Sequence, residues 1–170
     1  MRYYFDTEFI EDGKTIDLIS IGIRCEDGRE FYAESKDMPW DRILKHPWLV
    51  DNVVPWLESA ANPDHPCYKP KKEIAKEVLA FLTPNGSTPE LWAWFAAYDH
   101  VVLAQLWGKM IHMPRGLPQY TKDIRQLLDH VGVDQLPRQT STEHHALADA
   151  RHNEVMYNYL MKAWKEKVTL

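Results

Sequence analysis

The sequence lacks any apolar run that approaches the roughly 18 residues of a membrane-spanning helix. It contains only two cysteines, Cys25 and Cys67, which form no pattern typical of a disulfide framework or a zinc site. Strand-like sequence begins at Arg2, which leaves no room for a signal peptide. These absences predict a protein of the cytoplasm with no membrane partner.

The chain also lacks an excess of positive charge. It has 20 Lys and Arg residues against 25 Asp and Glu residues, a formal net charge of −5. This balance argues against a protein that grips nucleic acid through a broad basic face. It does not exclude a nucleic-acid enzyme whose carboxylates hold metals, because two divalent cations would bring −5 to about −1.

No internal repeat, low-complexity stretch or linker interrupts the 170 residues, so we expect one domain over residues 1–170. The expected strands cover residues 2–8, 17–25, 30–34 and 90–95, with a short one near Tyr120. The expected helices cover residues 71–82, 99–110, 122–131 and 145–167. Helical stretches between 41 and 61 are broken by Pro47 and Pro55, and residues 62–70 are expected to be a loop. This order predicts an α/β domain with a central mixed sheet.

Two acids sit close together in the first strand. Asp6 and Glu8 are two residues apart, so their side chains share one face of the strand. Two carboxylates on a largely buried strand repel each other unless something positive lies between them. A divalent cation meets that need, and hard oxygen ligands favour Mg²⁺ or Mn²⁺ over zinc. The alternative is that both acids lie at a solvated strand end.

A third acid, Asp99, follows the apolar stretch at residues 90–95. Ligands in open α/β sheets gather outside strand ends, which suits a metal ligand. The alternative is a helix cap, a routine role for aspartate at a helix N-terminus.

The last pair of candidate site residues is His144 and Asp149. On one regular helix these side chains would point about 140° apart. They converge more easily if His144 belongs to the preceding loop, with Ser141 and Thr142 as plausible caps of the helix that carries Asp149. The alternative is a solvated helix N-terminus with a favourably placed aspartate.

Taken together, these four acids and one histidine are the parts of two-metal phosphoryl chemistry. Two cations can stabilise the attacking and leaving oxygens of an in-line displacement. A histidine can take the proton from the attacking water.

The chain resembles the DEDDh branch of the DnaQ-like exonuclease superfamily in three motifs, Asp6-Thr7-Glu8, Tyr98-Asp99 and His144-x-Ala-Leu-x-Asp149. The resemblance implies a ribonuclease H-like fold with a five-stranded mixed sheet flanked by helices. It also implies that Asp6, Glu8 and Asp149 hold a first cation, and that Asp6 and, through water, Asp99 serve a second. His144 would be the general base, selected over His145 by the motif spacing.

A closer resemblance is to the actinobacterial ribonuclease AS family, carried by residues 6–13, 18–22, 91–94, 97–100 and 105–108. It implies a homodimeric 3′-5′ exoribonuclease that releases nucleoside 5′-monophosphates from single-stranded RNA with adenylate-rich 3′ ends. Two departures concern substrate contacts. Phe95 stands where many DEDDh enzymes have asparagine, and Phe9-Ile10 stand where many have Thr-Gly.

Other residues are open to two interpretations. Phe9 follows the acids and could stack on the terminal base, although an aromatic residue at a strand end is more often core. Trp40, Trp48 and Trp56 are expected to pack on one helical face. The lysines near residues 69–76 could contact phosphates, but a solvated helix face is the simpler interpretation.

Two alternatives to an exoribonuclease remain. The same chemistry would serve a 3′-5′ exonuclease acting on single-stranded DNA, because no motif reports on the 2′-hydroxyl. A nuclease fold used only to bind RNA is a different class, and the intact set of five residues argues against it.

Overall fold

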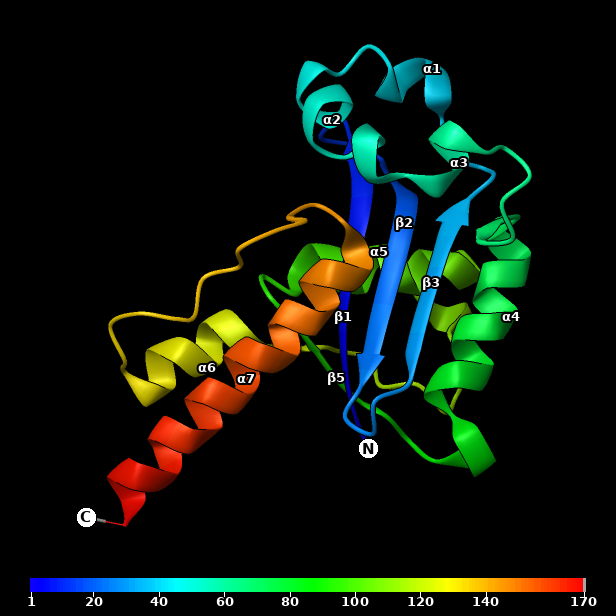
Figure 1. Cartoon of the computed structure of the whole chain (residues 1–170). Coiled ribbons are helices and arrows are strands. Elements are labelled where there is room, and N and C mark those ends of the chain that lie inside the picture. Colours follow the sequence, from blue (N-terminus) through cyan, green and yellow to red (C-terminus); the bar gives the residue numbers. More distant parts are fainter. Residues whose placement is uncertain (170) are drawn as a thin grey trace.

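The computed structural model describes residues 1–169, which form a six-stranded mixed sheet with helices on both faces (Figure 1). The strand order is β4-β3-β2-β1-β5-β6. The strands are β1 (Arg2–Glu11), β2 (Ile16–Cys25), β3 (Glu30–Ser35), β4 (Tyr68–Lys69), β5 (Glu90–Ala93) and β6 (Lys122–Asp123). The first three strands pair antiparallel, and β4, β5 and β6 join the sheet in parallel. The predicted α/β class is confirmed.

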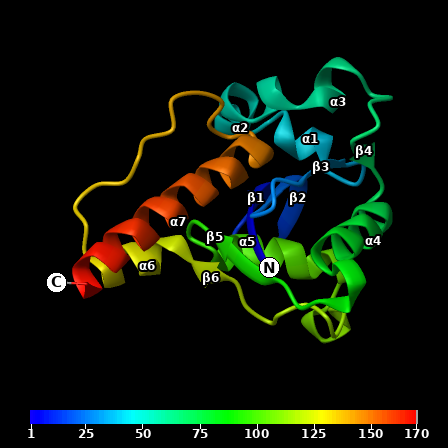
Figure 2. The same ribbon diagram turned by 60° about the horizontal axis from the view of Figure 1, so that its bottom comes forward.

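Different helices cover the two faces of the sheet (Figure 2). The long α7 and the shorter α6 lie together on one face, whereas α4 and α5 cover the other. The helices are α1 (Trp40–Ile43), α2 (Pro47–Asn52), α3 (Glu58–Ala61), α4 (Lys71–Leu82), α5 (Ala97–Ala104), α6 (Ile124–Val131) and α7 (Ala146–Val168). Short 3-10 turns are η1 (Val54–Trp56), η2 (Pro84–Gly86), η3 (Gln105–Trp107) and η4 (Met110–His112).

Strand alternation in β1 sends successive side chains into different cores. Tyr3 and Phe5 are buried with residues of α4 and α5. Tyr4, between them, is buried with Tyr157 and Leu160 of α7. Because side chains alternate across a strand, Asp6 and Glu8 continue the α7 side of β1 and Thr7 continues the α5 side.

A third cluster covers the far end of β1 and β2, where α1, α2 and α3 pack (Figure 1). A fully buried carboxylate of β3 joins α3 to the sheet through hydrogen bonds. Glu34 accepts hydrogen bonds from the backbone N–H groups of Glu58 and Ser59 at 2.8 and 2.9 Å, and from the Tyr32 hydroxyl at 2.7 Å. Three donors on one buried carboxylate supply the partners that burial demands.

The sheet has six strands where five were predicted. The extra strand, β4, lies within the expected loop at residues 62–70. It forms because the backbone N–H of Glu34 bonds to the carbonyl of Cys67, and that of Lys36 to the carbonyl of Lys69, each at 2.8 Å. A two-residue strand leaves no periodic pattern in a sequence, so the error was unavoidable from pattern alone.

Two predicted elements end early for backbone reasons. The strand expected over residues 90–95 ends at Ala93, and Phe95 turns the chain with a φ of 52°. The helix expected over residues 99–110 ends at Ala104 and continues as 3-10 turns around Gly108, whose φ is 84°. Glycine adopts such positive φ values without strain.

The expectation for three tryptophans is wrong. Trp40, Trp48 and Trp56 lie in three separate elements, α1, α2 and η1, because Pro47 begins α2 and Pro55 lies in the first turn of η1. Trp48 and Trp56 are 47% and 42% exposed. Within residues 1–169, no helix has both the length and the apolar character needed to cross a membrane.

Candidate active site

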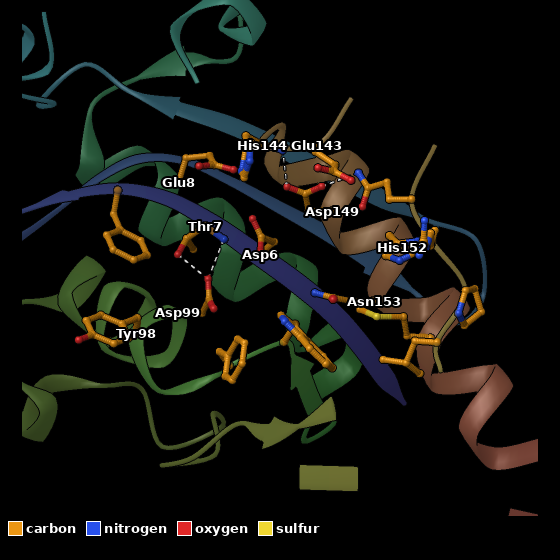
Figure 3. Close-up of a pocket in the computed structure, with 18 residues that line it drawn as sticks. Asp6, Thr7, Glu8, Tyr98, Asp99, Glu143, His144, Asp149, His152 and Asn153 are labelled. Atoms are coloured by element: carbon orange, nitrogen blue, oxygen red, sulfur yellow. Dashed lines mark hydrogen bonds between the residues drawn. The ribbon is translucent and has the colours of Figure 1, made fainter. Parts of the chain in front are cut away.

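A pocket of about 650 Å³ opens where β1 and β5 diverge (Figure 3). The two strands pair through Arg2, Tyr3 and Tyr4, and no later residue of β1 pairs with β5 in the described part of the chain. The edge of β1 is therefore open beyond Tyr4, at the carboxyl end of β5. This is the place where open α/β sheets bind ligands. Because the edge is open, groups from both faces of β1 reach the same pocket.

Asp6 and Glu8 project from β1 toward the N-terminal end of α7 (Figure 3). Asp6 lies opposite Gly22 of β2, and Glu8 is 8% exposed. The register between β1 and β2 shifts between Glu8 and Phe9. A bulge of this kind re-aims the side chains that flank it, and bulges are frequent beside active sites. The predicted pair of carboxylates on one strand face is present.

Asp99 reaches the pocket from the other face of β1. It lies in the first turn of α5 and is 5% exposed. The backbone N–H and the hydroxyl of Thr7 donate to its Oδ1 at 2.8 and 2.7 Å. Asp99 is not the helix cap, because the N-cap residue of α5 is Ala96. The two bonds from Thr7 instead fix the carboxylate against β1.

His144 lies in the loop and Asp149 in the first turn of α7, the arrangement that lets the two side chains converge. The backbone N–H of His144 donates to Oδ2 of Asp149 at 2.8 Å (Figure 3). His144 has a φ of 67°, in the left-handed region that non-glycine residues seldom adopt. Ser141 and Thr142 do not cap the helix. The N-cap is His145, whose Nδ1 accepts from the N–H of Ala148 at 3.4 Å.

Gly22 lets α7 approach the sheet. A Cβ atom at this position would lie 2.2 Å from the backbone nitrogen of Leu147, far inside contact distance. Ala146 and Ala150 are fully buried at the same end of the helix. The start of α7 therefore rests directly on β2, which carries Asp149 toward Asp6 and Glu8.

The donor set fits a hard divalent cation. Glu8, His144 and Asp149 each offer a ligand atom, and these atoms lie within 4.8 Å of one another. Among residues 1–169 no ion pair involves Asp6, Glu8, Asp99 or Asp149. Buried carboxylates without a cationic side chain are the surroundings in which Mg²⁺ or Mn²⁺ gains most.

Each of the four carboxyl groups has a raised pKa, and burial is the largest cause in every case. The pKa of Asp6 is raised further by the charges of Asp99, Glu8 and Asp149. Burial and then Asp149 raise the pKa of Glu8 to about 8. Burial raises the pKa of Asp99 to about 6, against the hydrogen bonds of Thr7. The pKa of Asp149 is also raised by burial. Without a cation, ionising this site costs folding free energy.

A pH dependence of stability follows. Between the ordinary carboxyl pKa of about 4 and a pKa of about 8, the folded state keeps a proton on Glu8 that the unfolded state has released. The free energy of unfolding should therefore fall as pH rises through this window in EDTA. Added Mn²⁺ should raise the melting temperature more at pH 8 than at pH 5, because cations bind the ionised form. Thermal melts from pH 5 to pH 8 measure both trends.

The matched control for these melts is Glu8→Gln, which cannot ionise. Other groups, such as His100 with its lowered pKa, also contribute to the pH dependence of the wild type. The difference between the two proteins isolates Glu8. Melting temperatures that change with pH identically in wild type and Glu8→Gln would contradict the assignment of the raised pKa.

Aromatic side chains line the pocket mouth. The rings of Phe9 and Tyr98 are nearly parallel, 5° apart, with centroids 5.8 Å from each other. Phe95 and Tyr98 are 60% and 59% exposed. On the opposite side, Trp48 of α2 packs edge-on against His144 with ring centroids 4.8 Å apart. Phe9 is partly buried and lines the pocket. The contact of Trp48 with His144 could not be predicted, because no pattern in the nearby sequence indicates it.

Basic residues are sparse around the pocket. Arg138 is the one arginine or lysine among the described residues that line it. Lys69, from the cluster considered for phosphate contacts, pairs with Glu77 at 2.7 Å. Arg125 and Lys122 pair with Asp129 and Glu90. Gln139, next to Arg138, donates to Oδ1 of Asp149 at 2.6 Å. Sequence reasoning missed Gln139, because nothing in a loop sequence indicates this contact.

Comparison with known proteins assigns the sequence to a family. Residues 1–161 match the family model described as the 3'-5' exoribonuclease Rv2179c-like domain. Two relatives from Mycobacterium tuberculosis are 43% identical to the chain over 152 residues, which cover 89% of this chain and 88% of each relative. They are 3'-5' exoribonuclease MT2234.1 of strain CDC 1551 / Oshkosh and 3'-5' exoribonuclease Rv2179c of strain ATCC 25618 / H37Rv.

Comparison with solved structures assigns the fold. The structure of S. pombe Pop2p in its Mg²⁺- and Mn²⁺-bound form aligns with a TM-score of 0.55 over 95% of this chain and 82% of that one. Its sequence identity is 10%, so the likeness concerns the fold alone. The ribonuclease H-like fold implied by the sequence resemblance is confirmed.

Proposed function

The chain belongs to the Rv2179c-like family of 3′-5′ exoribonuclease domains, and from this premise we propose that residues 1–170 form one domain that cleaves RNA by two-metal catalysis at Asp6, Glu8, Asp99, His144 and Asp149. The enzyme is a 3′-5′ exoribonuclease, a hydrolase of phosphodiester bonds. One observation carries the proposed mechanism: four carboxylates and a histidine meet at the open edge of β1, and within residues 1–169 no lysine or arginine forms an ion pair with any of them.

The family resemblance divides the roles. Asp6, Glu8 and Asp149 would hold a first divalent cation, and Asp6 with Asp99, acting through water, a second. His144, which lies within 4.8 Å of the ligand atoms of Glu8 and Asp149, is proposed as the base and not as a ligand. Two bound cations, Mg²⁺ or Mn²⁺, supply positive charge to the attacking and leaving oxygens of the displacement. The 2.8 and 2.7 Å bonds from Thr7 keep Asp99 in place on the α5 side of β1.

His144 acts as the general base in this proposal. It takes a proton from the attacking water and passes it to solvent, a role that histidine performs well near neutral pH. Its backbone is anchored by the 2.8 Å bond to Asp149, and its ring is bounded by Trp48. Both contacts restrict where the ring can lie, which supports a group that must meet one water molecule.

The substrate in this proposal is single-stranded RNA with an adenylate-rich 3′ end, and the products are nucleoside 5′-monophosphates. The aromatic side chains at the pocket mouth suit unstacked bases, since every base offers a π-face. Phe9, in ring contact with Tyr98, is the residue proposed to stack on the terminal base. Phe95 replaces the asparagine of many DEDDh enzymes with an exposed ring at the same mouth. We extend the proposal to a homodimer acting in the cytoplasm.

Arg138 is expected to contact the RNA backbone, since it lines the pocket and its side chain is exposed. Arg138→Ala should raise the KM for RNA and weaken the salt dependence of binding by about one phosphate contact, with kcat unchanged. Fluorescence anisotropy with labelled RNA at several salt concentrations measures the slope of the logarithm of the binding constant against the logarithm of the salt concentration. Arg115→Ala, which removes an exposed arginine that does not line this pocket, is the control. Equal salt slopes for both variants would contradict the contact.

Digestion of 5′-labelled poly(A), poly(U) and matched single-stranded DNA tests the function. Each substrate is incubated with Mg²⁺, with Mn²⁺ or with EDTA. We expect ladders shortened from the 3′ end, only with metal and fastest on poly(A).

The other outcomes are equally informative. Equal cutting of DNA would identify a single-stranded DNA exonuclease instead. RNA that is bound but not shortened under any metal would identify a binding protein and overturn two-metal catalysis.

A further inference from the structure

Asp149 accepts one hydrogen bond on each carboxylate oxygen. The backbone N–H of His144 donates to Oδ2 at 2.8 Å (Figure 3), and the side-chain amide of Gln139 donates to Oδ1 at 2.6 Å. A carboxylate oxygen has two lone pairs. Each oxygen of Asp149 therefore keeps one lone pair for a cation while its direction is set by a fixed donor.

The orientation of the Gln139 amide follows from its neighbours. Its Nε2 lies 2.6 Å from Oδ1 of Asp149 and 3.3 Å from the backbone carbonyl oxygen of Ser141. Both neighbours are acceptors, so the amide nitrogen and not the amide oxygen must face them. The two hydrogens of one amide thus join the loop before α7 to the carboxylate on α7.

The chemistry of this donor suits a ligand that must remain negative. A lysine or arginine in the same place would neutralise Asp149 and compete with a cation. A glutamine amide is neutral, so it fixes the direction of the carboxylate and leaves its charge available. Groups that hydrogen-bond to metal-ligating carboxylates tune the affinity of the site from outside it.

Gln139 lies in the loop that borders the pocket. It follows Arg138, which lines the pocket mouth, and it also lines a neighbouring hollow of about 360 Å³ together with His144 and Trp56. Gln139 therefore joins Ser141 of the loop to Asp149 of α7, next to the hydrogen bond that Asp149 accepts from the backbone N–H of His144.

We infer that Gln139 is a positioning residue that orients Asp149 for divalent cation binding and so sets the metal affinity of the enzyme. The inference rests on the proposed function, because it takes Asp149 as a metal ligand. Gln139 touches neither the substrate nor the cation in this role. It acts through the geometry of Asp149.

Calorimetric titration of the full chain with Mn²⁺ alone, without RNA, tests the inference. Gln139→Ala, and Gln139→Asn with its amide one methylene shorter, should both weaken Mn²⁺ binding by about tenfold or more. In RNA digestion at low Mn²⁺, kcat should fall, and saturating Mn²⁺ should restore it while KM for RNA stays unchanged. Gln135→Ala is the matched control, a glutamine in the same loop that is exposed and outside both hollows.

The same titration separates two kinds of failure. Wild-type protein that binds no Mn²⁺, or Asp149→Ala protein that binds as well as wild type, would overturn the proposed metal site and this inference with it. Wild-type binding that Asp149→Ala abolishes but Gln139→Ala leaves intact would overturn the inference alone. A raised KM with unchanged Mn²⁺ affinity would make Gln139 an RNA contact and would also overturn it. Melting temperatures in EDTA verify that the variants are folded.

Discussion

Replacing Asp6 with asparagine is expected to abolish RNA cleavage and, in EDTA, to raise the melting temperature. The proposed mechanism uses Asp6 for both cations, whose charge stabilises the transition state by several kcal/mol, so the rate should fall at least about a thousandfold. The same carboxyl is half-buried beside Asp99, Glu8 and Asp149, and loss of solvent together with their charges raises its pKa. Asparagine has nearly the same shape and carries no charge. The metal-free protein should gain on the order of 1 kcal/mol or more, about 2–4 °C per kcal/mol.

The two effects of Asp6→Asn are measured by digestion of labelled RNA with Mn²⁺ and by thermal melts in EDTA at pH 8. Asp12→Asn provides a contrast within the loop that follows β1. Asp12 accepts backbone hydrogen bonds from Lys14 and Thr15, which lower its pKa, so asparagine there should stabilise nothing and leave activity intact. An Asp6→Asn protein that is both active and less stable than wild type would contradict the metal assignment and the repulsion together.

Gly22→Ala is expected to damage both stability and activity, although residue 22 carries no side chain and touches no substrate. The new Cβ would lie 2.2 Å from the backbone nitrogen of Leu147. Backbone cannot rotate away as a flexible side chain can, so α7 must move off the sheet. We expect a loss of about 1–3 kcal/mol, the usual cost of overpacking. Displacing Asp149 by about 1 Å should slow cleavage by about a hundredfold.

Thermal melts and single-turnover cleavage at saturating Mn²⁺ measure the two losses for Gly22→Ala. Gly116→Ala is the matched control, because its Cβ would meet a neighbour only at 3.4 Å, the Cγ2 of Thr83. That contact is close to ordinary packing, so neither stability nor rate should change much. A Gly22→Ala protein with wild-type activity would mean that the position of α7 does not govern the site.

The sequence was most informative where residues act through short spacings. The pair Asp6 and Glu8 could be predicted to share a face, because strand periodicity is independent of the rest of the fold. A loop position for His144 could also be predicted as the arrangement in which it converges with Asp149 more easily, although a solvated helix N-terminus remained an alternative. Assigning these residues to one pocket needed the family resemblance, because β1, α5 and α7 are distant in the chain.

The missing parts depend on contacts that no local pattern encodes. Gln139 contacts Asp149 across a loop in which Thr142 and His144 adopt positive φ values of 55° and 67°, a conformation that non-glycine residues seldom adopt. The need for glycine at residue 22 is not visible in the sequence, because it arises from the close approach of α7 to β2. The helix cap was assigned to Ser141 and Thr142 by general preference, whereas His145 occupies that position. Propensity is a weak guide wherever tertiary contacts choose the backbone.

The meeting of three segments at the open edge of β1 has a consequence for the lifetime of the folded enzyme. Asp6, Asp99 and Asp149 belong to β1, α5 and α7, three segments that are otherwise joined by long stretches of chain. Cations bound between them would bind the folded chain and not the unfolded one, so they would stabilise the folded state by mass action and hold the three segments together. Amide exchange and proteolysis at the start of α7 would then be slowest in the metal-loaded enzyme. Molecules that have lost their metal would be both inactive and the first to open, so the same carboxylates would set both catalytic activity and the lifetime of the folded enzyme.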